Sequence, residues 1–191
     1  MKKLVWVLAL LSALPTSAWA RSFTSQVSEG SEIPKVRPEF RVPNEPNQLF
    51  YVQRSPNSNT VIYAARLDAK GNLDPSAPVE AFWRKFNIDG SKQPLNFIER
   101  MMAYGVKFDG HQDGKPVTFS IAALPERKVT VSLDDDHRPE ALMQIGSHLV
   151  KLAYVYLQVV EGGLLPRIPA LDIFGTDIAS GKAIHEHLIQ K

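Results

Sequence analysis

The chain has 191 residues, of which 44% are hydrophobic and none is cysteine, and its formal net charge is +2 at pH 7. The lack of cysteine excludes disulfides, thiolate metal sites and a cysteine nucleophile, and the length fits one domain with a sizeable core. Because Lys2 and Lys3 carry the excess charge, the remainder is neutral, which argues against nucleic acid as a partner.

The first twenty residues have the three parts of a secretory signal peptide. Met1–Lys3 is cationic, residues 4–14 are an apolar run, and Ala18-Trp19-Ala20 is an A-x-A cleavage signal. The run is too short to anchor the chain in a bilayer, and no later stretch is long enough. We therefore expect cleavage after Ala20, a periplasmic or secreted product and no membrane anchor after cleavage.

Residues 21–47 differ from the rest of the chain in composition. They are polar and contain closely spaced prolines, at positions Pro34, Pro38, Pro43 and Pro46. Because proline lacks an amide hydrogen and favours extended backbone, this leader is predicted to be a flexible or polyproline-like linker that rests on the domain near Phe40 and Val42. Residues 48–191 are predicted to be a single β-domain.

Strand patterns begin at Gln48. Residues 48–54 and 60–67 are rich in β-branched and aromatic side chains and flank a five-residue polar loop, which predicts a hairpin. Residues 79–86 alternate in part and predict a third strand. Further strands are predicted at 104–110 and 115–124 around an HQDG turn, and at 128–133, 140–146, 148–163, 167–174 and 183–189.

One segment has helical rather than strand periodicity. Leu95, Ile98 and Met102 recur at helical spacing, with Phe97 and Met101 beside them, so a short helix is predicted at about 93–103 with this stripe in the core. The fold class predicted for the chain is mainly β: an antiparallel β-sandwich or irregular barrel of about ten short strands with one short helix.

The polar cluster at 54–59 combines turn chemistry with one residue that a turn does not need. Residues 55–59 favour a loop through local side-chain hydrogen bonds and a proline. Arg54, by alternation, shares a face with Phe50 and Val52, so its charge lies at the end of an apolar stripe. We favour an ion pair with an acid such as Asp172 or Asp177, and an anionic ligand is the alternative.

The predicted ligand-binding surface is the loop end around Arg54. Its candidate residues, each in that loop or at a predicted strand end, are Arg54, Ser55, Asn57, Tyr104, Lys107 and Asp177, with Glu161 as a further neighbour. No catalytic residues are assigned, because the sequence has no G-x-S-x-G elbow and no spaced Ser, His and Asp set. The FGTDIASGK segment has the wrong spacing for a phosphate loop, and DDDH lacks the pattern of an EF-hand.

His185 and His187 are the candidate metal ligands. At positions i and i+2 of a strand their rings would face the same side, which is workable geometry for a metal. A zinc site needs a third ligand, and spacing along the chain supplies none. No metal and no other cofactor are therefore predicted.

Several phrases of the sequence resemble one family. PNQLFYVQRSPNSNTVIY, AYGVK, VEGG and LDIFGTDIASGK are similar to an exported bacterial family, domain of unknown function 4833, over about residues 44–189. The resemblance implies an exported single-domain protein and no known activity.

We expect a non-catalytic binding or interaction module whose partner is an unidentified small molecule or envelope protein. The alternatives are a cell-envelope hydrolase that uses carboxylates, and a carrier of a small apolar ligand inside a barrel.

Overall fold

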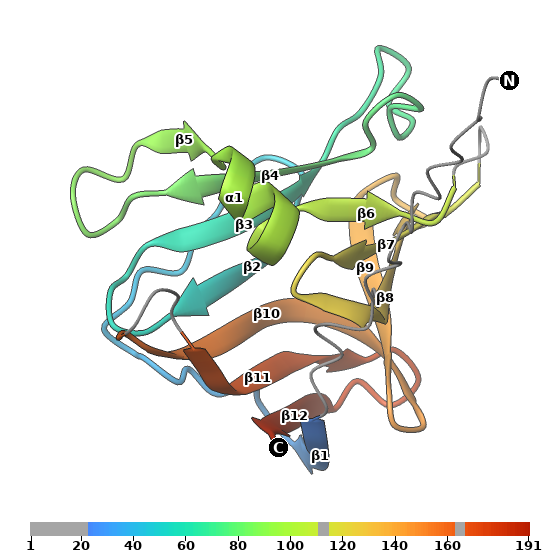
Figure 1. The fold of residues 1–191 in the computed structure, drawn as a ribbon. Coiled ribbons are helices and arrows are strands. Elements are labelled where there is room, and N and C mark those ends of the chain that lie inside the picture. Colours follow the sequence, from blue (N-terminus) through green and yellow to red (C-terminus); the bar gives the residue numbers. More distant parts are fainter. Residues whose placement is uncertain (1–22, 111–114, 163–166) are drawn as a thin grey trace, which may run out of the picture.

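The computed structural model describes residues 23–110, 115–162 and 167–191 and is mainly β, as expected (Figure 1). The predicted signal peptide at 1–20 and the HQDG turn at 111–114 lie outside the described residues. In the described part of the chain, no helix has the length and apolar character needed to cross a membrane.

The described residues form twelve strands, where about ten were expected. Their bounds are β1 Phe23–Gly30, β2 Gln48–Arg54, β3 Thr60–Ala65, β4 Val79–Arg84, β5 Lys92–Pro94, β6 Val106–Phe108, β7 Val117–Ile121, β8 Leu124–Leu133, β9 Pro139–Ile145, β10 His148–Val160, β11 Arg167–Asp177 and β12 Ala183–Gln190. The two strands that periodicity did not predict are β1, which is polar and exposed, and β5, which has three residues.

All twelve strands belong to one mixed sheet that curls into a half-barrel (Figure 1). The path runs β5-β4-β3-β2-β10-β9-β8-β7-β6, and β11, β12 and β1 continue from the other edge of β10. The first part of β10 pairs with β9 and a later part pairs with β2. The β2–β10 ladder is parallel and every other strand ladder is antiparallel.

The predicted helix crosses between the two ends of this path. It consists of α1, Phe97–Glu99, and a π-helical turn, η1, Arg100–Tyr104, and it connects β5 to β6 (Figure 1). The first predicted helical positions instead belong to β5 and to Asn96. The Asn96 side chain accepts a hydrogen bond from the backbone amide of Glu99, and the Glu99 side chain accepts one from Asn96, so the helix begins with a capping box.

The apolar stripe of this helix is on the surface. Phe97, Ile98, Met101 and Met102 are between 46% and 69% exposed, and only Leu95, which precedes the helix, is buried. The prediction that the stripe packs into the core is therefore wrong for these four residues. The helix lies between β5 and β6, and only its last residue, Tyr104, is buried. The four apolar side chains stay outside because side chains of the sheet already fill the interior.

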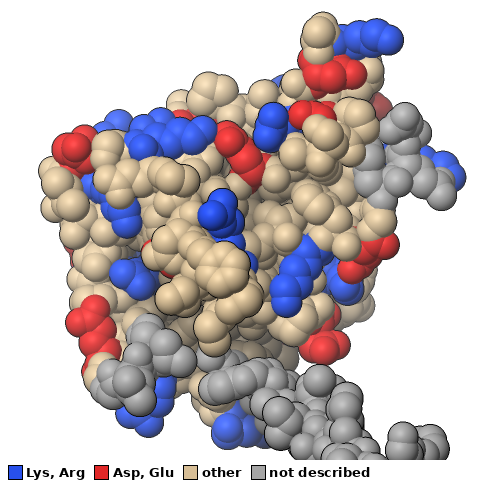
Figure 2. Space-filling model, turned by 45° about the horizontal axis from the view of Figure 1, so that its top comes forward, with Lys and Arg blue, Asp and Glu red and all other residues tan. Residues whose placement is uncertain are grey.

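Charged side chains are spread over the face that carries the helix. Figure 2 shows Lys and Arg interspersed with Asp and Glu among the residues drawn in colour, with no large area of one sign.

The sheet separates two apolar clusters. Alternate residues of β2, Phe50 and Val52, enter the large cluster inside the half-barrel, whereas Tyr51 belongs to a smaller cluster on the outer face. On that outer face the rings of Tyr51, Tyr154 and Phe174 stack in a row across β2, β10 and β11.

Part of the expected leader is ordered on the domain. Residues Phe23–Gly30 form β1, which pairs along its whole length with β12. Farther along, Phe40 is buried in the outer cluster as expected, whereas Val42 is exposed. The hydroxyl of Tyr154 donates to the carbonyl of Pro34, which ties the leader to β10.

A buried ion pair connects two strands that share no ladder. Glu186 of β12 is 1% exposed and accepts hydrogen bonds from Arg127 of β8 and from Ser25 of β1. The strand path places β8 and β12 on different branches of the sheet, so this pair connects the two branches across the interior.

Candidate functional site

Arg54 is the last residue of β2 and points into the half-barrel. It lies opposite Leu157 in the parallel β2–β10 ladder, on the same face as the buried Phe50 and Val52. The alternation of β2 predicted this placement. A guanidinium therefore lies at the edge of the interior apolar cluster.

The expected ion pair of Arg54 is absent among the described residues, so that interpretation is wrong. Its Nε atom is buried without a hydrogen-bond partner. Asp172 lies on the outer face of the sheet, opposite Tyr156. Asp177 lies opposite Val150 of β10, whereas Arg54 lies opposite Leu157 of the same strand. Seven residues of extended strand separate these two positions by about 23 Å.

Arg54 instead shares an aromatic ring with a second cation. The guanidinium carbon of Arg54 is 5.4 Å from the centre of the Trp83 ring, and the Lys85 amine is 4.4 Å from it. Lys85, like Arg54, pairs with no carboxylate in the described part of the chain. Trp83 is 3% exposed, and its indole nitrogen has no hydrogen-bond partner among the residues that the structure describes. Two cations and two unsatisfied donors thus gather around one indole.

Tyr104 completes this group from the end of the helix. Its ring packs edge-on against Trp83, with centroids 5.2 Å apart, and its carbonyl accepts a hydrogen bond from the Tyr63 hydroxyl. Burial raises the pKa of the Tyr104 hydroxyl, and the nearby charge of Arg54 acts in the opposite direction. The hydroxyl therefore stays protonated at neutral pH and can donate to a ligand.

A narrow apolar cavity of about 40 Å³ lies inside the half-barrel, and Tyr104 forms part of its wall. Its walls include Val52, two residues before Arg54 on the same face, Leu157, opposite Arg54 on β10, and Tyr104. The remaining walls come from β1, β7, β8, β10, β11, the β7–β8 turn and the helix, and all of them are apolar. We call Arg54, Trp83, Lys85 and Tyr104, with this cavity, the Trp83 site.

Two of the predicted ligand-binding residues have local structural roles. The Ser55 hydroxyl donates to the carbonyl of Val159 and accepts from its amide, which ties the loop to β10. The Asn57 side chain accepts from the amide of Asn59, as an Asx turn does. Both side chains are explained by the loop that follows Arg54.

The other predicted neighbours do not join the Trp83 site, apart from Tyr104. Lys107 is exposed on β6, where it pairs with Ser120, and the next residue, Phe108, contacts the core residue Phe119. Glu161 is exposed just after β10. Asp177 is buried at the far end of β11, where it accepts hydrogen bonds from the amide and hydroxyl of Ser180.

The hydrogen bond from Ser180 gives Asp177 a pH-dependent role in stability. This bond, more than any other contact, lowers the pKa of Asp177. The ionised carboxylate therefore stabilises the fold above the unfolded pKa, and that stability is lost as pH falls through the folded pKa. We expect Ser180→Ala to lower the urea midpoint at neutral pH and to have a smaller effect near about pH 3.

The control is Ser28→Ala, which alters an exposed serine of β1 and should leave the urea midpoint unchanged at both values of pH. An equal loss for Ser180→Ala at both values would contradict the role given to Asp177.

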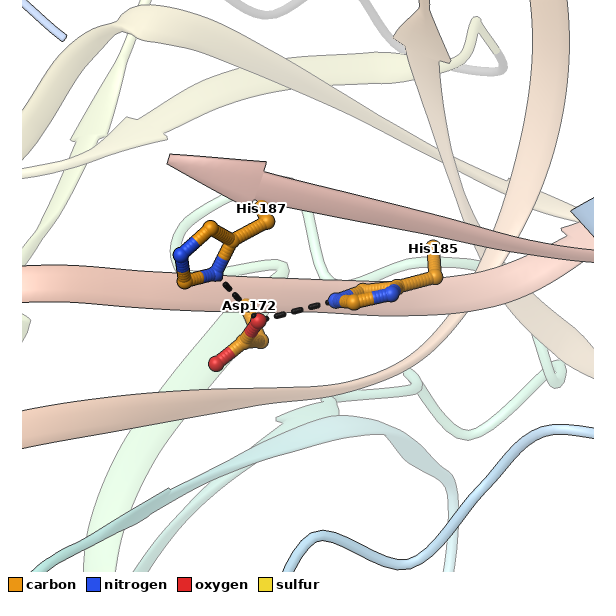
Figure 3. Close-up of side chains that lie close together, drawn as sticks. All are labelled: Asp172, His185 and His187. Atoms are coloured by element: carbon orange, nitrogen blue, oxygen red, sulfur yellow. Dashed lines mark hydrogen bonds and ion pairs between the residues drawn. The ribbon is translucent and has the colours of Figure 1, made fainter. Parts of the chain in front are cut away.

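A second polar cluster lies on the outer face of β11 and β12. His185 and His187 share one face of β12, as predicted, and Asp172 lies in register with His187 on β11. The same oxygen of Asp172, Oδ1, is 2.8 Å from Nε2 of His185 and 2.7 Å from Nδ1 of His187 (Figure 3). Sheet pairing supplies the third polar group that spacing along the chain could not reveal.

Comparisons with known proteins give one match. A family model described as a domain of unknown function (DUF4833) matches residues 50–187, which include Arg54, Trp83, Tyr104 and the Asp172 cluster. No curated protein and no solved structure matches the chain.

Proposed function

Because the chain belongs to the DUF4833 family, which has no assigned function, we propose from the geometry alone that it is a non-catalytic module that binds a small organic anion at the Trp83 site. The predicted signal peptide supports a periplasmic or secreted location. The observation that carries the proposal is the pair of cations, Arg54 and Lys85, over one buried indole with no described carboxylate partner.

An anion would relieve three unfavourable features of this group. The Arg54 and Lys85 charges lie near the same ring and repel each other, and each gains only about 0.5–1 kcal/mol from the aromatic ring. A buried donor without a partner costs roughly 1–3 kcal/mol, and Arg54 and Trp83 each contain one. A carboxylate or phosphate could accept from both donors and pair with both cations.

The cavity suggests that the anion has an apolar end. The cavity shares Tyr104 with the charged group, and two further wall residues, Val52 and Leu157, are sequence and ladder neighbours of Arg54. Its small volume excludes a large ring system, so the proposed ligand is a short-chain carboxylate. The alternative function predicted from the sequence, a carrier of a small apolar ligand, would use the same cavity but would not need the charges of Arg54 and Lys85.

The hydrolase alternative has little support at this site. The carboxylate that acts on Tyr104 is Glu99, which the capping box already engages at the helix start. Cations and neutral donors make up the remaining polar groups of the Trp83 site. Such a set favours binding an anion over general acid and base catalysis by paired carboxylates.

The proposal can be tested with the fluorescence of Trp83, the single tryptophan of residues 21–191. We expect hexanoate to change this fluorescence saturably. Hexan-1-ol has the alkyl chain without the negative charge, and sulfate has the charge without the chain, so each should act only at much higher concentration. Arg54→Met should weaken hexanoate binding by at least about tenfold, because a charged hydrogen bond contributes roughly 1.5–3 kcal/mol.

Arg41→Met is the matched control, because Arg41 also lies over an aromatic ring, that of Phe86, outside the Trp83 site. Equal binding of hexanoate by the Arg54 and Arg41 variants would refute an anion site, and tighter binding of hexan-1-ol would favour an apolar carrier. Without ligand, Arg54→Met should leave stability unchanged or raise it. A large loss of stability would instead assign Arg54 a structural role.

A further inference from the structure

We propose that Asp172, His185 and His187 form a binding site for a divalent transition-metal ion such as Zn²⁺. The three ligand atoms lie within 4.8 Å of one another, and in the described part of the chain no other group of three potential ligands meets this condition. The site is independent of the Trp83 site, because it lies on the opposite face of the sheet.

The sheet positions all three side chains before any ion binds. Two ligands come from one strand at i and i+2, and the third comes from the neighbouring strand in direct register. The His185 ring stacks on Phe174, with centroids 4.5 Å apart and planes within 9° of parallel. Phe174 in turn stacks on Tyr154. A rigid aromatic row thus fixes the orientation of one imidazole.

The burial of the cluster suits a site that is open on one side. The Asp172 side chain is only 9% exposed, whereas those of His185 and His187 are 33% and 28% exposed. The carboxylate therefore forms the floor and the imidazoles form the rim. Figure 3 shows Asp172 between the two rings. An ion could enter from solvent and keep one or more water ligands, as three-ligand zinc sites do.

Two acidic residues line a surface hollow that His185 also lines. The hollow has a volume of about 210 Å³, and the two acidic residues are Glu29 and Glu32. Glu29 pairs with Lys182, so Glu32 contributes most of the uncompensated negative charge of this hollow. Such charge raises the local concentration of cations near the site.

The donor set selects among metals. Two imidazole nitrogens and one carboxylate oxygen suit zinc, cobalt, nickel or iron, whereas calcium and magnesium prefer oxygen ligands alone. Bonds of roughly 2.0–2.1 Å around a tetrahedral ion place neighbouring ligand atoms about 3.4 Å apart. The present contacts of 2.7 and 2.8 Å need to widen by only about 0.6 Å, which small side-chain rotations supply.

The same geometry also satisfies a simpler structure, in which both imidazoles donate to one carboxylate oxygen. Metal binding needs the other tautomer of each neutral ring, with Nδ1 of His185 and Nε2 of His187 protonated. A hydrogen-bonded triad without metal affinity is therefore the outcome that the experiment must separate from a metal site.

The test is calorimetric titration of the full chain, first treated with a chelator and then dialysed, with ZnCl₂ at neutral pH. We expect one equivalent of Zn²⁺ to bind, Co²⁺ to give a visible absorption band at the same stoichiometry, and Ca²⁺ not to compete. His187→Gln and Asp172→Asn should each weaken Zn²⁺ binding at least about tenfold.

His148→Gln is the matched control, because His148 is also half-buried and lies near two carboxylates, Glu29 and Asp177. It should bind Zn²⁺ as the unaltered protein does. The absence of stoichiometric binding in the unaltered protein would overturn the proposal, and so would equal binding by folded His187→Gln. Circular dichroism of each variant establishes whether it is folded. If His187→Gln proves misfolded, Asp172→Asn, which keeps the shape of the side chain, still tests the site.

Discussion

Gly175→Ala is expected to lower the free energy of unfolding by about 3 kcal/mol or more, because it places a methyl group where the core has no room. A β-carbon at Gly175 would lie 2.4 Å from the carbonyl oxygen of Lys151 and 2.4 Å from a methyl carbon of Val150. Both contacts come from β10, which pairs with β11 in the centre of the sheet. The backbone there cannot move without disturbing ladders on both sides.

Urea unfolding followed by circular dichroism measures this effect. The matched control is Gly30→Ala in β1, where the nearest atom to a new β-carbon is 3.6 Å away, and its cost should be within about 0.5 kcal/mol. If Gly175→Ala proved as mild as Gly30→Ala, the close approach of β10 and β11 would be wrong.

Arg127→Met is expected to cost about 2–4 kcal/mol, because it leaves the carboxylate of Glu186 buried without its cation. Glu186 is 1% exposed and would keep only the hydroxyl of Ser25 as a partner. The Arg127 side chain is 27% exposed, so water screens part of the pair and the expected cost is below that of a fully buried one. The measurement is again the free energy of unfolding in urea.

Two further variants distinguish the effect of losing the ion pair from the effect of losing side-chain packing. Lys128 follows Arg127 on β8, and Lys128→Met removes an exposed ion pair with Asp109, so it should cost under about 1 kcal/mol. The double variant Arg127→Met/Glu186→Leu replaces the pair by apolar groups and should recover most of the loss. Failure of the double variant to recover stability would show that packing, and not the stranded charge, causes the effect.

Periodicity predicted most of the sheet, because interior strands alternate or are continuously apolar. The long segment predicted as strand at 148–163 is the strand β10, His148–Val160, in agreement with its content of β-branched residues. The polar strand β1 has no such pattern, since it gains its ladder from β12 and buries little of its own surface. The parallel pairing of β2 with β10 joins segments far apart along the chain, so local pattern could not reveal it.

The helix shows that a periodic apolar pattern can predict secondary structure correctly without predicting which side chains are buried. Its periodicity indicated a helix correctly, but periodicity does not show whether a neighbour covers the apolar stripe. Met101 and Phe97 are exposed because the helix bridges the edges of the sheet instead of lying within the interior.

Prediction of the candidate sites depended on sheet register. Alternation placed Arg54 on the interior face, and the same rule applied to β4 would have placed Trp83 and Lys85 together on one face. That Arg54 reaches across β3 to Trp83 is a property of the strand order. Asp172 likewise meets His187 only through the β11–β12 ladder, so no spacing rule could supply it.

The parallel β2–β10 ladder also determines when the domain can finish folding. Ser55 bonds to Val159, 104 residues later, and Ser25 of β1 bonds to Glu186, 161 residues later. Closing such long loops before any contact forms is entropically slow, so folding should take milliseconds to seconds. A growing chain exposes one edge of β2 until β10 has been synthesised, and during that interval it is most open to aggregation.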